Sequence, residues 1–102
     1  MIKASPNFTM DELTFSETAT RKDIDNTPSD EVLDNLYITA MEMENVRELL
    51  DNNPILISSG YRSLELNTLL GSKPTSAHIR GLACDFTCPK YGDPHDIVDA
   101  IF

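Results

Sequence analysis

Cysteine and glycine are scarce in this chain and tryptophan is absent: its 102 residues include two cysteines and four glycines. Two cysteines exclude the disulfide framework that stabilises many small secreted domains. Cys84 and Cys88 lie four positions apart in a segment that we predict to be a strand, which places their Cα atoms about 13 Å apart, beyond disulfide reach. A C-x3-C pair without a second pair is also a poor zinc motif. We therefore expect two free, half-buried thiols.

Basic residues are few as well. Eight Lys and Arg residues stand against 17 Asp and Glu residues, which gives a net charge of −9. Phosphate binding requires clustered basic side chains, so this composition argues against a nucleic-acid partner. The acidic residues are concentrated between positions 11 and 51, and we interpret them as the solvated face of helices.

Long apolar runs are also missing. No segment approaches the roughly 18 apolar residues of a membrane span, so we expect no membrane partner. The first residues, Met1 to Pro6, lack the apolar region of a secretory signal, which predicts synthesis in a cytoplasm without a signal peptide. The content of hydrophobic residues, 40%, and of charged residues, 25%, is typical of a globular protein. We predict a single domain over residues 1–102.

Capping residues predict two helices in the first half of the chain. Thr9, with Glu12 three positions later, forms a capping box before a short helix over residues 10–15. Thr27 as N-cap and Pro28 at the first helical position predict a long helix, which the Asn-Asn-Pro sequence at 52–54 ends. Its apolar face is predicted to comprise Val32, Leu33, Leu36, Ala40, Met43, Val46, Leu49 and Leu50. Between the two helices, the polar residues 16–26 show no strong period.

The second half predicts strands alternating with short helices. Residues 55–59 are a short apolar run after a proline, typical of a buried strand. Residues 82–88 predict a second strand, with Leu82, Cys84 and Phe86 on one face and Ala83, Asp85 and Thr87 on the other. Helices are expected from the Ser63 cap through residue 70 and after the Asp-Pro pair at 93–94. The predicted fold class is therefore α+β, with N-terminal helices packed on a small, mostly antiparallel sheet.

The last predicted helix ends without a capping signal. Ile97, Val98, Ile101 and Phe102 are apolar, and no glycine, proline or basic residue follows them. We expect the chain to continue past Phe102 in the complete gene product, so that the domain is C-terminally incomplete.

One motif carries a chemical signal. Residues 76–85 follow the pattern S-x-H-x-x-G-x-A-x-D, which places His78 and Asp85 on either side of Gly81. Imidazole and carboxylate are two of the three protein ligands that a catalytic zinc ion needs. The mixed donor set suits zinc, and donor type leaves manganese and iron open. One His and one Asp at this spacing also occur by chance, so the pair alone leaves the site undecided.

A second motif joins the first. The sequence Ser58-Ser59-Gly60-Tyr61-Arg62-Ser63, followed by residues 76–85, resembles the D-alanyl-D-alanine carboxypeptidase-like zinc peptidases, a group that extends to lysostaphin-type endopeptidases and the hedgehog signalling domain. The small phage and prophage members are the most similar. Their N-termini resemble residues 7–13 and the Ile-Asp-Asn-Thr-Pro sequence at 24–28.

This resemblance implies a function and a site. It implies that His78 and Asp85 are zinc ligands, that Arg62 stabilises a substrate oxyanion, and that Ser76 and Tyr61 line the substrate pocket. The implied substrate is the stem peptide of peptidoglycan, cut either by a D-Ala-D-Ala carboxypeptidase or by an endolysin-like endopeptidase. Access to the wall would come from phage-type release or from delivery within a virion. A surface ion pair for Arg62 and a turn cap for Ser76 remain alternatives.

The chain also departs from the family pattern. Family members carry an acidic general base shortly before a Trp-x-His, whose histidine is the third ligand, and this sequence has no tryptophan. His95 does not match that histidine, so we expect it at the surface and the third ligand beyond residue 102. We accordingly expect the C-terminal strands of the family fold to lie outside residues 1–102. This leaves two alternatives: a non-catalytic relative that binds a cell-wall peptide or a protein, self-associating through an uncovered sheet edge, or a plain acidic interaction domain.

Overall fold

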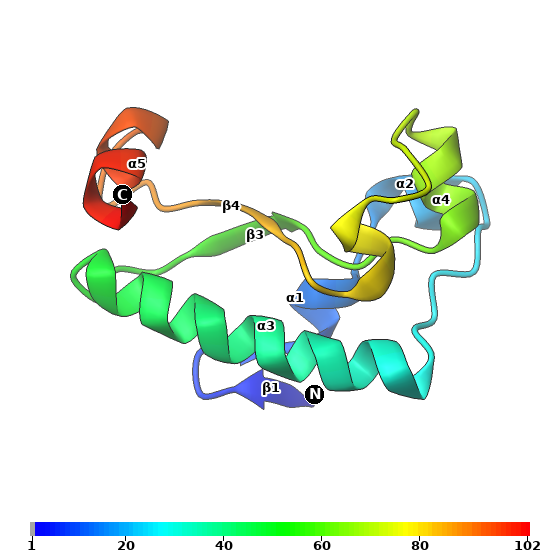
Figure 1. Ribbon diagram of the computed structural model, residues 1–102, viewed down its shortest axis with the longest axis horizontal. Helices are drawn as coiled ribbons and strands as arrows, with labels where there is room; N and C mark the ends of the chain where they lie inside the picture. Colours follow the sequence, from blue (N-terminus) through cyan, green and yellow to red (C-terminus); the bar gives the residue numbers. More distant parts are fainter. Residues whose placement is uncertain (1) are drawn as a thin grey trace.

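A computed structural model describes residues 2–102 (Figure 1). About half of these residues are helical, and the strands form two small antiparallel sheets, so the fold class is α+β as predicted. The elements in chain order are β1 (Lys3–Ser5), β2 (Phe8–Thr9), α1 (Met10–Thr14), α2 (Glu17–Arg21), α3 (Asp30–Leu49), β3 (Leu56–Ser59), α4 (Leu64–Leu69), the 3-10 helix η1 (Ala77–Arg80), β4 (Asp85–Thr87) and α5 (Pro94–Ile101).

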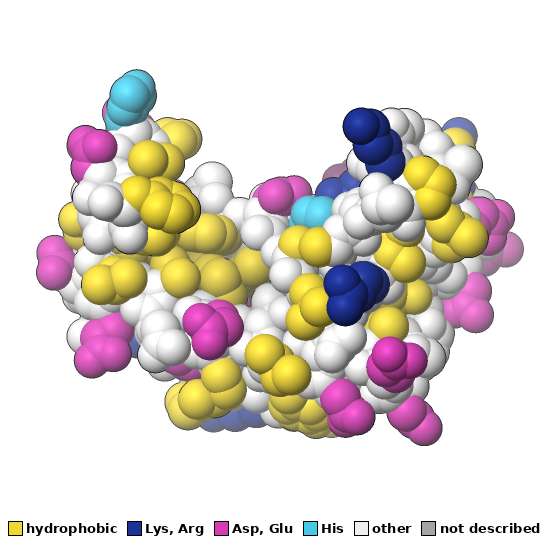
Figure 2. Space-filling model, viewed as in Figure 1, with side chains coloured by type: hydrophobic (Ala, Val, Ile, Leu, Met, Phe, Trp, Pro, Cys, Tyr) yellow, Lys and Arg dark blue, Asp and Glu magenta, His cyan; other side chains and the backbone are white. Residues whose placement is uncertain are grey.

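The long helix α3 is the base of the molecule. It runs along the length of the fold, with β3 and β4 lying over it and β1 against its other side (Figure 1). Helix α5 lies at one end above the sheet, and α4 with η1 lies at the other end. Between these two ends the surface is hollowed, with hydrophobic side chains on its floor (Figure 2).

Helix α3 begins two residues later than the sequence predicts. Its N-cap is Ser29, whose hydroxyl accepts the Val32 N–H at 3.3 Å. Thr27 is not the cap because its own N–H donates to the Asp25 carboxylate at 2.9 Å, in a turn that precedes the helix. The capping box predicted at Thr9 for α1 is confirmed. The predicted helix start at the Asp-Pro pair is also confirmed, and there Asp93 forms a capping box with Asp96 that was not predicted.

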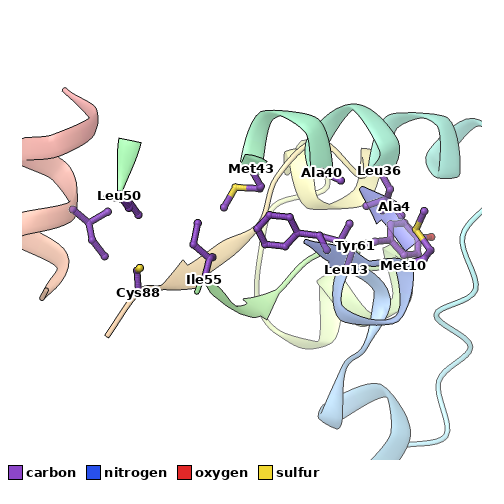
Figure 3. Packing of buried hydrophobic residues seen from close by; sticks show 12 residues of the cluster. Ala4, Met10, Leu13, Leu36, Ala40, Met43, Leu50, Ile55, Tyr61 and Cys88 are labelled. Atoms are coloured by element: carbon purple, nitrogen blue, oxygen red, sulfur yellow. The ribbon is translucent and has the colours of Figure 1, made fainter. Parts of the chain in front are cut away.

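The hydrophobic core lies between α3 and the segments above it. Leu36, Ala40 and Met43 lie along one side of α3 and face the side chains of the N-terminal elements and of Tyr61 (Figure 3). Leu50 is fully buried, whereas Leu49, which the predicted apolar face included, is 53% exposed. Because α3 ends at Leu49, the Leu49 side chain lies outside the core, whereas Leu50, the residue after the helix, folds back into it.

The strands are shorter and less buried than predicted. β3 pairs with β4 in antiparallel register, Ile57 opposite Phe86. The prediction of a buried strand over 55–59 is wrong in that Leu56 is 56% exposed, because the two-stranded sheet buries only one face. β4 covers only residues 85–87 of the predicted strand 82–88, and the alternation holds from Cys84 to Thr87, with Cys84 and Phe86 half-buried and Asp85 exposed. It is wrong at Leu82, which is 38% exposed because it lies before the strand begins.

Four short elements were not predicted. Strands β1 and β2, helix α2 and helix η1 are each two to five residues long, too short for a periodic pattern to identify them. Within the described residues, none of the helices combines the length and apolar character that a membrane span requires.

Candidate functional site

His78, Asp85 and Arg62 converge from three different segments. The Nε2 atom of His78 lies 3.6 Å from Oδ2 of Asp85, and Nη2 of Arg62 lies 3.9 Å from the same oxygen. Both distances exceed hydrogen-bond length. The imidazole and the guanidinium therefore both approach one oxygen of the Asp85 carboxylate without a hydrogen bond to it.

Helix η1 positions His78. Ser76 is the N-cap, and its hydroxyl accepts the His78 N–H at 3.3 Å, so the turn-cap role considered for Ser76 is present. The His78 ring is buried, and its Nδ1 lies 2.7 Å from the carbonyl oxygen of Gly60. Because a carbonyl only accepts, Nδ1 carries the proton and Nε2 of the neutral ring keeps its lone pair toward Asp85. This is the arrangement in which metal-binding histidines are held by an outer hydrogen bond.

Asp85 begins strand β4 and presents its carboxylate to solvent. Its side chain is 62% exposed, in contrast to 11% for His78. The backbone is fixed by pairing opposite Ser59 and by the Ser58 hydroxyl, which donates to the Asp85 carbonyl at 3.1 Å. The carboxylate is thus open to a ligand while its backbone is held by the sheet.

Arg62 is held on one side only. Its Nη1 donates to the Ser72 hydroxyl at 3.0 Å, and its backbone N–H donates to the His78 carbonyl at 3.1 Å. Its Nε–H is buried and has no partner within residues 2–102. The surface ion pair considered as an alternative is present only as the 3.9 Å approach to Asp85. Nη2, which lies toward Asp85, is therefore the guanidinium nitrogen that a ligand could reach.

Tyr61 is packed more deeply than a typical surface substrate contact. Its exposed fraction is 8%, and its N–H donates to the Leu13 carbonyl at 2.7 Å. Burial, and secondarily the negative charge of Asp25, raise the pKa of the Tyr61 phenol, which therefore stays protonated. Tyr61 lines a cleft of about 270 Å³ together with Arg62, Ser58 and Phe15.

The pair His78 and Asp85 fits two positions of a zinc site. Two ligand atoms of one tetrahedral zinc ion lie about 3.3 Å apart, close to the 3.6 Å between Nε2 and Oδ2. Within residues 2–102, no group of three His, Cys, Asp or Glu side chains could hold a metal ion. His95 is exposed on α5, as predicted. Among the described residues, His78 and Asp85 thus offer two donors of the three that a catalytic zinc site would need.

The neighbouring thiols do not add a ligand. Both cysteines are free, as predicted, and Cys88 is fully buried. Burial, with a smaller contribution from Asp85, raises the pKa of the Cys84 thiol to about 11. Neither thiol completes a group of three possible ligands with His78 and Asp85 within the described residues.

Sequence reasoning missed the partners that hold the site. Gly60 contributes only its carbonyl, and Ser72 lies in a loop without a recognisable pattern. Gly60 did carry a signal, since it belongs to the Ser-Ser-Gly-Tyr-Arg motif. A Cβ at this position would lie 2.2 Å from the Leu13 carbonyl oxygen, so only glycine fits against α1.

The comparisons with known proteins agree with this geometry. The family model for Peptidase M15 matches residues 6–100, nearly the whole chain. Neither the curated proteins nor the solved structures gave a match. Because the family model covers more than half of the sequence and both motifs, the chain belongs to the peptidase M15 family.

Proposed function

We propose that this protein is a zinc peptidase that hydrolyses the stem peptides of peptidoglycan. The observation that carries the proposal is the convergence of His78, Asp85 and Arg62 around one point in a member of a peptidase family. His78 Nε2 and an Asp85 carboxylate oxygen would hold the ion. The proposal requires a general base and a third protein ligand in addition to His78 and Asp85.

Each side chain has a task that its surroundings support. When bound, zinc supplies Lewis acidity that activates water and polarises an amide carbonyl. The Gly60 carbonyl keeps His78 in the tautomer that offers Nε2. Arg62 is permanently charged and is oriented by Ser72, so it stabilises the negative charge that develops on the substrate carbonyl oxygen. Tyr61 and Ser76 are proposed to line the pocket in which the stem peptide lies.

Zinc binding tests the first part of this proposal. We expect isothermal titration to show zinc binding that weakens at least about tenfold in His78→Ala and in Asp85→Asn, because each change removes a donor. His95→Ala is the matched control, since it removes the other histidine of the chain, which is exposed on α5, and should leave the affinity unchanged. Equal binding by wild type and His78→Ala would remove the basis for the site.

Hydrolysis tests the second part. Purified muropeptides are incubated with the zinc-loaded protein and read by mass spectrometry. Loss of a terminal alanine indicates a carboxypeptidase, and cleavage within the stem indicates an endopeptidase. We expect Arg62→Ala to lower kcat by about 100-fold, the typical cost of losing one oxyanion donor. Metal binding without any product would favour the non-catalytic peptide-binding alternative.

A further inference from the structure

Asn26 joins three segments that are distant in the sequence. It lies half-buried in the arm, which we define as residues 22–29 between α2 and α3. Its Nδ2 donates to the Thr14 carbonyl at 2.9 Å and to the Tyr61 carbonyl at 3.1 Å. Its Oδ1 accepts the Ser63 N–H at 2.7 Å. Both amide hydrogens and the amide oxygen are therefore used.

Two of these three bonds flank Arg62. Tyr61 precedes it and Ser63 follows it, so one amide side chain holds the backbone on both sides of the guanidinium residue. The third bond, to the Thr14 carbonyl, connects Asn26 and the Tyr61–Ser63 backbone to the end of α1. The backbone of Arg62 itself is tied to His78 by the 3.1 Å bond to the His78 carbonyl.

The chemistry at this position is specific to an amide. Two carbonyl oxygens need donors and one N–H needs an acceptor, and all three are within hydrogen-bond distance of one planar group. An aspartate would keep the acceptor but place a charged carboxylate against two carbonyls. An alanine would leave all three backbone groups without a side-chain partner.

We propose that Asn26 is the positioning residue for Arg62: it fixes the Tyr61–Ser63 backbone so that the guanidinium faces the point between His78 and Asp85. This inference rests on the proposed function, because the rate effect of Arg62 depends on peptide hydrolysis. The amide acts through Arg62 and has no contact with the His78 or Asp85 side chain among its hydrogen bonds.

A double-mutant cycle tests this role. We expect Asn26→Asp to lower kcat for muropeptide hydrolysis by about 10- to 100-fold, since misplacing a catalytic group by about 1 Å costs that much, with little change in KM. Arg62→Lys already removes the planar guanidinium with its fixed set of donors. In that background, Asn26→Asp should lower kcat by less than about twofold. Equal losses in both backgrounds would show a structural role only and overturn the proposal.

Asn53→Asp is the matched control. Asn53 is also half-buried and donates from its side chain to one backbone carbonyl, that of Leu50 at 3.0 Å, beyond the end of α3. Its substitution should leave kcat unchanged. If Asn26→Asp does not fold, Asn26→Ser replaces it, because serine brings no charge against the two carbonyls.

A second readout is independent of activity. By nuclear magnetic resonance, Asn26→Asp should shift the Arg62 Nε–H signal, whereas Asn53→Asp should leave it in place. In the uncharged Asn26→Ala variant, which removes the acceptor, the Ser63 amide should exchange with solvent at least about tenfold faster. If wild type yields no product, the proposed function fails and these signals alone decide the positioning role. If wild type is active and Arg62 Nε–H does not move in Asn26→Asp, the positioning role alone fails.

Discussion

The segment between His78 and Asp85 is bonded to the long helix α3 through Arg80 and Gly81, whereas Arg62 is held by short segments at the other side of the site. We call residues 76–85 the metal half and residues 60–63 the arginine half. In the metal half, the Thr39 hydroxyl on α3 donates to the Gly81 carbonyl at 2.7 Å, and Asn35 donates to the Arg80 carbonyl at 2.8 Å. In the arginine half, the corresponding anchors come from the arm and from α1.

This difference predicts unequal stability. Thr39 is buried on a 20-residue helix, so the metal half opens only when α3 loses its packing. The arm has no secondary structure and is mostly exposed, so the arginine half can open locally at lower cost. The two halves meet where His78 bonds to the carbonyl of Gly60 and Arg62 bonds to the carbonyl of His78. Gly60 therefore belongs to both.

Gly60→Ala should have the largest effect, because it acts at this junction. The new Cβ would lie 2.2 Å from the Leu13 carbonyl oxygen and 2.8 Å from its carbonyl carbon, which are backbone atoms that cannot turn away. We expect the free energy of unfolding in urea to fall by about 3 kcal/mol. Both halves should loosen together, seen as faster amide exchange at Tyr61 and at Arg62, whose N–H bonds to His78.

Gly71→Ala is the control for this change. Gly71 also precedes a loop, has φ of +78° and has open space where a Cβ would go. Its substitution should cost only about 1–2 kcal/mol, the penalty of left-handed backbone for alanine. A loss in Gly60→Ala no larger than in Gly71→Ala would contradict the close packing of Gly60 on α1.

Thr39→Val should separate the two halves. It keeps the shape of the side chain but leaves the buried Gly81 carbonyl without its donor, which costs about 1–3 kcal/mol. Backbone chemical shifts should change over residues 78–85 more than over residues 60–63. Thr87→Val, at an exposed position of β4, should leave unfolding free energy and these shifts nearly unchanged. Equal shift changes in both halves would show that they form one cooperative unit.

Local chemistry explains which elements could be predicted. Thr9 with Glu12 predicts a helix start because both partners lie within one turn. The choice between Thr27 and Ser29 depended on Asp25, whose bond to the Thr27 N–H no spacing rule anticipates. The β1–β2 hairpin is held to α3 by Glu44, 39 positions from Ser5, so its sequence alone carries little signal.

Partners that are distant in the sequence also limit what could be predicted of the site. The spacing of His78 and Asp85 and the Ser-Ser-Gly-Tyr-Arg motif identify three groups, of which the structure brings His78 and Arg62 each within 4 Å of the Asp85 carboxylate. Their roles in metal and substrate binding stay predictions. The partners Asn26, Ser72 and Thr39 could not be found from the sequence because their contacts lie 10 to 42 positions away. Asn26 and Thr39 bond to backbone carbonyls, and Ser72 bonds to one side chain.

Glu44→Gln should have the smallest effect on the free energy of unfolding and should leave the metal half and the arginine half unchanged. Glu44 on α3 accepts hydrogen bonds from the Ser5 hydroxyl and from the backbone and side-chain amides of Asn7. Partial burial raises its pKa, but these bonds, together with the charge of Arg47, outweigh burial and lower the pKa below the usual 4.5. The carboxylate therefore stabilises the fold above about pH 4.5, and this contribution is lost as the pH falls through the lowered value.

The test compares unfolding in urea at neutral and at acidic pH. At pH 7 we expect Glu44→Gln to lose about 1 kcal/mol or less, because the site is only partly shielded from solvent. Below the folded-state pKa, wild type and variant should be equally stable, since protonated glutamate and glutamine are both neutral. Glu42→Gln, exposed on the same helix, should show no such convergence. If the Glu44 variant instead shifts the Arg62 or His78 signals, the N-terminal hairpin is coupled to the site and the two-half description is too simple.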